Sequence, residues 1–190
     1  MAGPVYPVTD KDNGHLDSNG YRWFALKLGQ VMWRVMGLGI NWQPMRPLTA
    51  NWRGTELLVS YLTPCPPIAL RSPYLGSVAQ TEALMPSQGL VVEDSGGSVG
   101  IAAVSVVGQA TLRITTDRAM QGTATISYAT LSLDGHGRVA DSDGAVAPLD
   151  YTYLPGSGMY VEANVTALVS APYPLYNWCV AFNDFPIQEA

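Results

Sequence analysis

The sequence contains few charged residues, few histidines and few cysteines. Charged residues make up 13% of the 190-residue chain, about half of their usual share in soluble domains, whereas apolar residues make up 47%. Because a chain this apolar and this weakly charged can bury enough surface to offset its conformational entropy, the composition excludes a disordered protein. The length allows one compact domain, or a small domain with an additional helical piece.

The shortage of basic residues excludes proteins that bind phosphate backbones. The formal net charge is −5, and the 10 Lys and Arg residues are scattered, with Arg138 alone in residues 122–190. Nucleic acid is therefore not an expected partner, since its binding needs clustered basic side chains. No apolar run approaches the roughly 18 residues of a membrane span. The N-terminal residues carry no signal-peptide pattern, so no signal peptide is expected.

Cysteine, histidine and acidic residues do not form a recognisable metal site. Cys65 and Cys179 lie far apart and match no ligand spacing, so we expect two buried free thiols rather than a disulfide. His136 has no second His or Cys at ligand spacing. Residues 141–144 (DSDG) lack the remaining acidic ligands of a calcium loop. We therefore expect no metal and no cofactor.

Residues 18–39 have the pattern of one amphipathic helix. Apolar side chains recur at i, i+3, i+4 and i+7, which predicts that one face of the helix packs against other protein. Asp17 or Ser18 can cap the helix by accepting from its free N–H groups, and Gly37 and Gly39 mark its end. The apolar face comprises Tyr21, Phe24, Leu28, Val31, Met32 and Val35.

After residue 43 the apolar period changes from that of a helix to that of strands. In residues 123–130, Ala124, Ile126 and Tyr128 point to one side, and Thr125 and Ser127 to the other. Because no helical pattern separates the strands, we predict a mainly β fold, a jelly-roll-like antiparallel β-sandwich, preceded by the N-terminal amphipathic helix. The expected domains are residues 1–43 and 44–190. The predicted strands are residues 57–62, 90–92, 101–107, 111–115, 123–130 and 178–182.

The most specific motif, Asp12-Asn13-Gly14-His15, lies just before the helix. A carboxylate three residues before an imidazole can hold the ring Nδ1–H and so orient the ring as a general base. Together with residues 15–21 (HLDSNGY), this D-x-x-H block resembles the last signature block of the SGNH (GDSL-type) hydrolases. The resemblance implies that Asp12 and His15 belong to a Ser-His-Asp triad, and that residues 1–43 are the remnant of an SGNH-like α/β domain.

The sequence departs from this family at the nucleophile. In SGNH hydrolases a Gly-Asp-Ser block precedes D-x-x-H, and the residues before Asp12 do not contain it. We therefore expect a C-terminal portion of such a protein, catalytically silent because no nucleophile or oxyanion donor accompanies the imidazole. Asp94-Ser95 follows an apolar strand, like that block, but Ser95-Gly96-Gly97 is better interpreted as a hairpin turn.

The C-terminal part of the chain is rich in aromatic residues. Residues 172–180 (PYPLYNWCV) resemble the end of certain bacteriophage and prophage proteins in which an SGNH-type region precedes a C-terminal β-domain. This resemblance implies a virion protein, such as a fibre, tailspike or decoration protein, whose partners are other virion subunits or its own copies. In residues 135–160, the acceptors Asp141 and Asp143 and the stacking faces of Tyr151 and Tyr153 predict a site for bacterial surface polysaccharide.

Two functions are therefore weighed. The first is a non-catalytic structural or adhesive module of a virion that binds glycan. The alternative is the C-terminal part of an SGNH-type carbohydrate esterase whose serine lies on an upstream segment or on another chain. The predicted glycan loop also has a competing interpretation as a subunit interface, where tyrosine is equally common.

Overall fold

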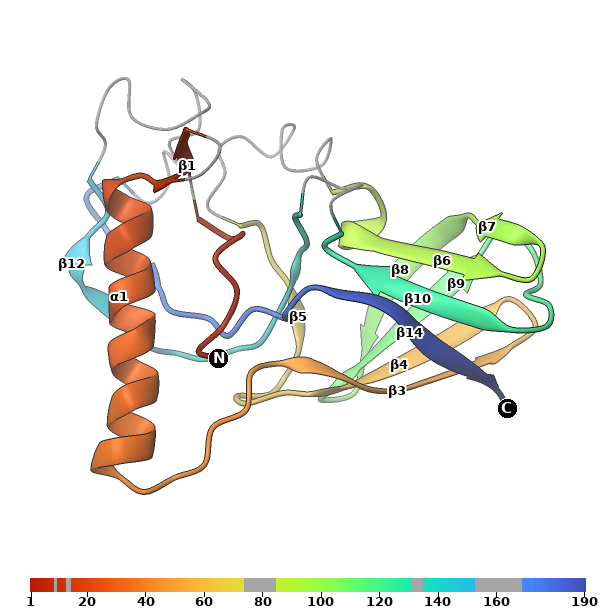
Figure 1. Ribbon diagram of the computed structural model, residues 1–190, viewed down its shortest axis with the longest axis horizontal. Helices are drawn as coiled ribbons and strands as arrows, with labels where there is room; N and C mark the ends of the chain where they lie inside the picture. The colour runs from red at the N-terminus through yellow and green to blue at the C-terminus, as the bar shows by residue number, and fades with distance from the viewer. Residues whose placement is uncertain (9, 13–14, 74–84, 131–134, 153–168) are drawn as a thin grey trace.

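The computed structural model describes residues 1–8, 10–12, 15–73, 85–130, 135–152 and 169–190. An N-terminal helix stands at one side of the molecule, and a strongly curved sheet forms the other side (Figure 1). Extended chain lies between them in this view. The predicted class, mainly β with one N-terminal helix, is confirmed for the part of the chain that is described.

The helix follows the sequence signals at both of its ends. Helix α1 (Ser18–Met32) continues directly into a π-helical turn, η1 (Trp33–Gly37). The carboxylate of Asp17 accepts from the backbone N–H of Gly20 at 2.7 Å, so Asp17 is the N-cap. After η1 the chain turns away at Gly39, whose φ of +65° lies in the left-handed region that favours glycine.

Eight strands form the main sheet, and neighbouring strands are antiparallel except for one pair. The exception is β14 beside β3, a parallel contact in which Gln188 lies opposite Asn51 and Glu189 opposite Trp52. In sheet order the strands are β7 (Gly97–Val99), β6 (Leu90–Asp94), β10 (Ala124–Tyr128), β14 (Phe182–Glu189), β3 (Arg46–Arg53), β4 (Glu56–Leu62), β9 (Thr111–Thr116) and β8 (Ile101–Val107).

This sheet is nearly closed and barrel-like, so the prediction of a two-layered sandwich is wrong. Its two edge strands, β7 and β8, are consecutive in the chain and are joined through Gly100. A Cβ atom at Gly100 would clash with the carboxylate of Asp117, so a larger residue at this junction would require that side chain to move. Closing a sheet in this way leaves little free edge for other strands to pair with.

Alternation along the strands fills the interior of the barrel-like sheet. As predicted, Ala124, Ile126 and Tyr128 of β10 are buried, whereas Thr125 and Ser127 are only partly buried. Most of the predicted strands are present, but β14 begins at Phe182, where the prediction for residues 178–182 ended. Cys65 and Cys179 are both free thiols, as predicted, but only Cys179 is buried and Cys65 is partly exposed.

A second, smaller core lies between helix α1 and the sheet. It gathers Trp23 from the helix together with residues far along the chain, including Tyr151, Tyr173 and Trp178. Three small two-stranded pairings surround it: β1 (Asp10–Asp12) with β2 (His15–Leu16), β5 (Ala69–Leu70) with β11 (Val139–Ala140), and β12 (Val146–Asp150) with β13 (Pro172–Pro174). The helix therefore shares its core with residues 140–178, across the expected domain boundary at residue 43.

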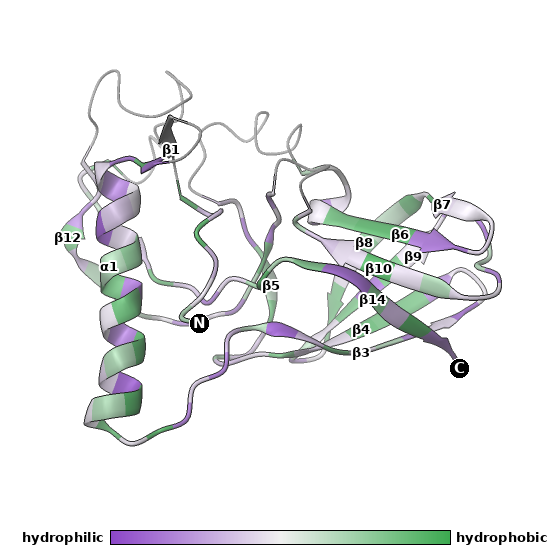
Figure 2. Cartoon of the chain, viewed as in Figure 1, coloured by the Kyte–Doolittle hydropathy of each residue, from purple (hydrophilic) through white to green (hydrophobic). Residues whose placement is uncertain are grey.

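The helix faces the opposite way from the sequence expectation. Asn19, Trp23 and Lys27 are buried against the rest of the chain. Of the predicted apolar face, Tyr21, Leu28, Met32 and Val35 are 41–52% exposed, and Phe24 and Val31 are partly buried. In Figure 2 the lower part of the helix is coloured mostly as apolar. None of the helices described is long and apolar enough to cross a membrane.

Candidate ligand-binding site

The Asp12–His15 motif lies in a β-hairpin. Strands β1 and β2 are antiparallel, with Asp12 opposite His15, and the His15 side chain is exposed. The two residues between them, Asn-Gly, are the pair that two-residue hairpin turns prefer. The D-x-x-H spacing therefore has an explanation in hairpin formation that requires no catalytic role. The side chain of Asp12 lies outside the described part of the structure.

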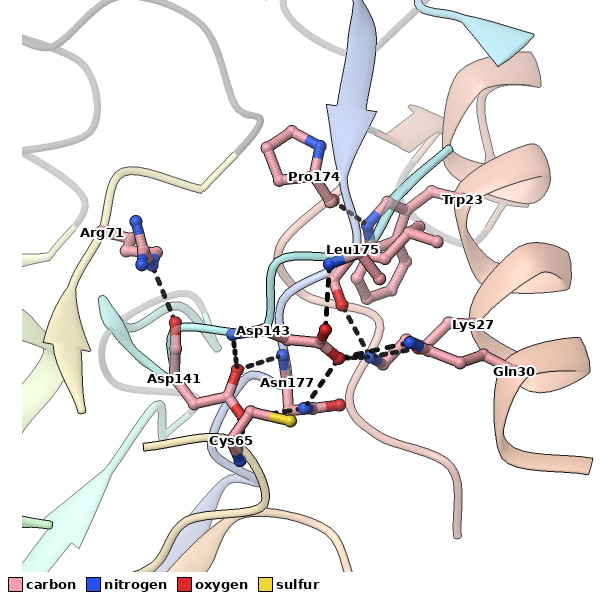
Figure 3. A network of polar contacts seen from close by, with 11 residues as sticks. Trp23, Lys27, Gln30, Cys65, Arg71, Asp141, Asp143, Pro174, Leu175 and Asn177 are labelled. Carbon is pink, nitrogen blue, oxygen red and sulfur yellow. Dashed lines mark hydrogen bonds and ion pairs between the residues drawn. The ribbon is translucent and has the colours of Figure 1, made fainter. Parts of the chain in front are cut away.

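Asp141 is the centre of a buried hydrogen-bond network rather than a surface acceptor (Figure 3). Its side chain is 0% exposed and accepts four hydrogen bonds. The donors are the backbone N–H of Cys65 at 2.9 Å, the backbone N–H and Nδ2 of Asn177 at 2.9 and 2.7 Å, and the backbone N–H of Asp143 at 3.1 Å. These bonds connect three segments that are distant in sequence, so Asp141 stabilises the fold.

Asp143 lies beside Asp141 and faces the helix. One of its oxygens lies 3.8 Å from Lys27 Nζ and accepts from Gln30 Nε2 at 3.2 Å and from Asn177 Nδ2 at 3.3 Å. The other oxygen accepts from the backbone N–H of Ala145 at 3.0 Å. The side chain is 14% exposed, so this carboxylate remains in reach of solvent.

Lys27 attaches the helix to the extended chain at residues 172–177. Its Nζ is enclosed and donates to the carbonyl oxygen of Leu175 at 2.7 Å and to Gln30 Oε1 at 2.8 Å. One turn earlier, Trp23 Nε1 donates to the carbonyl oxygen of Pro174 at 3.0 Å. Burial lowers the pKa of Lys27, although the charges of Asp143 and Asp141 oppose this shift.

The network has the chemistry of a scaffold rather than of a catalyst. The ammonium of Lys27 is 2% exposed, so a substrate cannot reach it. Burial raises the pKa of the Cys65 thiol, which keeps that sulfur protonated and weakly nucleophilic. In the described residues no three His, Cys, Asp or Glu side chains gather in a way that could hold a metal ion.

A pocket opens next to Asp143, where the end of the helix meets the chain that follows it. Its volume is about 340 Å³. A second pocket of about 220 Å³ adjoins it and shares Arg34 and Trp42 with the first. The first pocket is lined by Gln30, Val31, Trp33, Arg34, Leu38, Ile40, Trp42 and Asp143, and the second also by Asn41, Gln43, Leu62 and Pro64.

Arg34 and Trp42 form the wall between the two pockets. The guanidinium carbon of Arg34 lies 5.6 Å from the centre of the Trp42 ring, a cation–π arrangement. Trp42 Nε1 donates to the carbonyl oxygen of Met1 at 3.1 Å. The Nε of Arg34 is buried and has no hydrogen-bond acceptor among the described residues, which costs free energy.

Three of the four residues predicted to bind glycan lie in the described part of the structure, and they differ in exposure. Asp141 is enclosed, and Tyr151 is 3% exposed and packs edge-on against Tyr173, with 5.9 Å between the ring centres. Tyr153 lies outside the described residues. Of the three described residues, Asp143 lines one of the two described pockets, and Asp141 and Tyr151 line neither.

The sequence reasoning missed the other residues of this pocket. The available signal for this pocket was a pair of tryptophans, Trp33 and Trp42, that flank the end of the helix. The sequence could not predict that Asp141 is fully buried whereas Asp143 is only partly buried, because both residues lie in the same polar segment, residues 141–144.

Ser95, the weak nucleophile candidate, occupies the predicted hairpin turn. Strands β6 and β7 pair with Asp94 opposite Gly97, and Ser95 Oγ bonds to the backbone of Thr123. Asp94 accepts from Arg118 through both oxygens, at 2.6 and 2.9 Å. The Arg118 guanidinium therefore holds the pKa of Asp94 well below its usual range, helped by two backbone N–H groups.

Comparison with known proteins assigns the chain to no family. No protein family model matches the sequence, and no curated protein matches it. A solved structure, the N-terminal part of the bacterial S-layer protein SbsC, aligns with 93% of this chain at 9% identity and a TM-score of 0.39. The chain spans 30% of the length of that structure. A likeness this distant transfers neither a fold name nor a function.

Proposed function

We propose that the chain is a non-catalytic binding module that holds a carbohydrate in the two pockets around Trp42. The observation that carries the proposal is a tryptophan, Trp42, that lines two pockets and lies beside the guanidinium of Arg34. The volume of the larger pocket, about 340 Å³, lies within the range of small-molecule sites.

The lining matches the two faces of a sugar ring. Indole faces such as those of Trp33 and Trp42 offer flat apolar area at low entropic cost, which suits the C–H face of a pyranose. Sugar hydroxyls need both donors and acceptors, and Asp143, Gln30 and Arg34 supply them at one end of the pocket. Charge-assisted bonds from a carboxylate and a guanidinium are stronger than neutral ones and fix orientation.

The second pocket favours a ligand longer than one sugar. Both pockets share the Arg34–Trp42 wall, so neighbouring units of a chain could occupy the two sides of the same ring. The second pocket adds the amides of Asn41 and Gln43. This arrangement moves the expected glycan site from the aromatic loop after Gly135 to the end of the helix, with Asp143 retained.

The test is binding to an array of bacterial surface polysaccharides, with the full chain and three variants. Trp42→Ala and Arg34→Ala should each abolish retention that the unaltered chain shows. Leu48→Ala is the matched control, because Leu48 lies on β3, is 47% exposed and lines neither pocket. No retention of the unaltered chain by any polysaccharide, or equal retention by all variants, would contradict the proposal.

The biological setting stays a prediction from sequence resemblance. We propose, on the resemblance of residues 172–180 alone, that the module is a structural or adhesive part of a bacteriophage virion, assembled with other virion subunits or with its own copies. Antibodies against the chain should then label purified virions in electron micrographs. Absence of label from virions whose genome encodes the chain would contradict this setting.

The esterase alternative is supported by one observation, the pairing of Asp12 with His15 across β1 and β2. It requires a serine from another segment or chain, which the network around Asp141 does not provide. We expect hydrolysis of nitrophenyl acetate and of acetylated sugars by the chain to stay at the background rate. Turnover above background that His15→Ala removes would favour the esterase instead.

A further inference from the structure

The outward face of helix α1 and turn η1 is apolar and carries no charge. Every exposed residue from Tyr21 to Ile40 is uncharged, and the three basic residues of this stretch, Arg22, Lys27 and Arg34, are buried or partly buried. The exposed fractions of the large apolar residues on this face range from 41% at Leu28 to 77% at Met36. The charges behind the net charge of −5 therefore lie elsewhere on the chain.

The exposed apolar residues follow the spacing of a helix-pairing seam. Tyr21, Ala25, Leu28, Met32 and Val35 are all exposed, and the intervals between them alternate between four and three residues. This average period of 3.5 residues is that of the a and d positions at which two helices interdigitate. The opposite face, with Asn19, Trp23 and Lys27, already packs on the chain itself.

We infer that this seam pairs with the same seam of a second copy of the chain, with the two helices antiparallel about a twofold axis. The exposed fractions of Tyr21, Leu28, Met32, Val35 and Met36, with those of the small residues between them, correspond to on the order of 600 Å² per copy. Two such faces, fully covered, would reach the lower limit of stable interfaces, and one face lies at the upper end of what a monomer usually leaves exposed in one patch.

Self-pairing suits both the charge and the shape of the seam. A twofold contact brings the same surface of both copies together, so a seam with charges of one sign would repel its own copy. This seam carries no charge and has no such repulsion. In antiparallel register, Ala25 lies opposite Leu28 of the second copy, which pairs a small side chain with a large one. Tyr21 lies opposite Met32 of the second copy, which places the methionine sulfur against the tyrosine ring. At Gly29 a Cβ would meet no atom within 4 Å, so the backbone itself is open to close approach.

A membrane surface is the less favoured occupant. Helices that lie on anionic membranes present lysine and arginine beside their apolar face. Here Lys27 is enclosed by Gln30 and Leu175, and Arg34 lies over Trp42. None of the seam residues lines either pocket around Trp42, so pairing and ligand binding can be tested separately.

The test is sedimentation velocity of the full chain from low micromolar to sub-millimolar concentration. We expect a monomer–dimer equilibrium, and Leu28→Glu and Met32→Glu should each raise the dimer dissociation constant at least about a hundredfold. Leu48→Glu, at a site of similar exposure on β3, is the control and should leave it unchanged. Thermal unfolding of the two helix variants, measured where the chain is monomeric, should match that of the unaltered monomer, since glutamate is a good helix former and both sites are exposed.

Several outcomes would overturn the inference. A monomer at every concentration would do so, as would a dimer that survives both helix substitutions or that Leu48→Glu disrupts equally. A monomer that sediments with vesicles of phosphatidylglycerol and phosphatidylcholine, and loses this in Leu28→Glu, would assign the face to a membrane surface instead.

Discussion

In the barrel-like sheet the inward side chains are apolar, whereas the inward face of helix α1 carries Asn19 and Lys27 beside Trp23. The sheet is held by alternating strands whose buried members, such as Ile126 and Leu112, are 0% exposed. The helix is held by hydrogen bonds to carbonyl oxygens and by Asp143. The comparison teaches that the apolar face of a helix need not be the face that packs on its own chain.

The sheet should be the more sensitive region to loss of apolar volume. Ile126→Ala removes buried methyl groups from the centre of β10, so we expect a loss of about 2–5 kcal/mol in the free energy of unfolding. Denaturant titration measures it. Leu48→Ala, at an exposed position on β3, should change that free energy by no more than about 0.5 kcal/mol. Equal effects at both positions would contradict an apolar core in the sheet.

The helix side should be sensitive to loss of one buried charge. Lys27→Met leaves Asp143 without its cation, and we expect a loss of about 3 kcal/mol, the lower end for a broken buried ion pair. Adding Asp143→Asn should recover part of this loss, because the uncompensated charge is removed. The double-mutant cycle in urea measures the recovery. A double variant as unstable as the sum of the two single variants would show that the pair is not coupled.

High pH should destabilise the barrel-like sheet through its buried phenols. Burial raises the pKa values of Tyr61, Tyr128 and Cys179, so below the ordinary pKa values their contribution to stability is fully present. As pH rises past about 9–10, the unfolded chain loses these protons first, and each group removes up to about 1.4 kcal/mol per pH unit. Lys27 has the opposite effect. Because its pKa is lowered in the folded chain, its contribution to stability increases as pH rises toward the ordinary pKa of lysine.

Tyr61→Phe isolates this effect. The Tyr61 hydroxyl is buried and has no hydrogen-bond partner among the described residues, so its removal should not lower stability at neutral pH. The fall in the free energy of unfolding above pH 10 should then be shallower than in the unaltered chain. Urea titrations from pH 7 to pH 11 measure both. An unchanged slope would mean that Tyr61 ionises normally.

The smallest effect is expected at the tip of the β6–β7 hairpin. Asp94→Asn removes the ion pair with Arg118, so stability at pH 7 should fall by less than in Lys27→Met. Because the pKa of Asp94 is lowered, its contribution is present above about pH 4 and is lost as pH falls further. The unaltered chain should therefore lose more stability between pH 7 and pH 3 than the variant. Asp150→Asn, at an exposed site, serves as the control.

Local patterns predicted much of the fold, and distant contacts account for the errors. The helix and β10 were predictable because their signals come from residues that are close together in the sequence. Asp17 is a capping residue at the start of the helix, and Ile126 belongs to the apolar–polar alternation of β10. Closure of the sheet depends on β14 meeting β3, a parallel contact between residues 188–189 and 51–52, and no local signal reports it. The inward face of the helix was missed because its partners, such as the carbonyl oxygen of Leu175, lie far away in sequence.

The candidate site was only partly predictable for the same reason. Asp143 was identified from its composition and spacing, but Asp141 beside it is buried by Cys65 and Asn177. Trp42 reaches the pocket because the chain turns at Gly39 and folds back past Arg34. The Asn-Gly pair inside the D-x-x-H block was a readable hairpin signal and offered a simpler interpretation of that motif.

Native-state hydrogen exchange tests most directly whether helix and sheet are held by different chemistry. Residue-resolved exchange in the unaltered chain and in Lys27→Met would give opening free energies for amides of Trp23–Gln30 and for those of β4, β9 and β10. We expect Lys27→Met to lower protection in the helix by more than in the three strands. An equal loss of protection in the helix and the strands would contradict this distinction, since it would show one cooperative unit held by a common core.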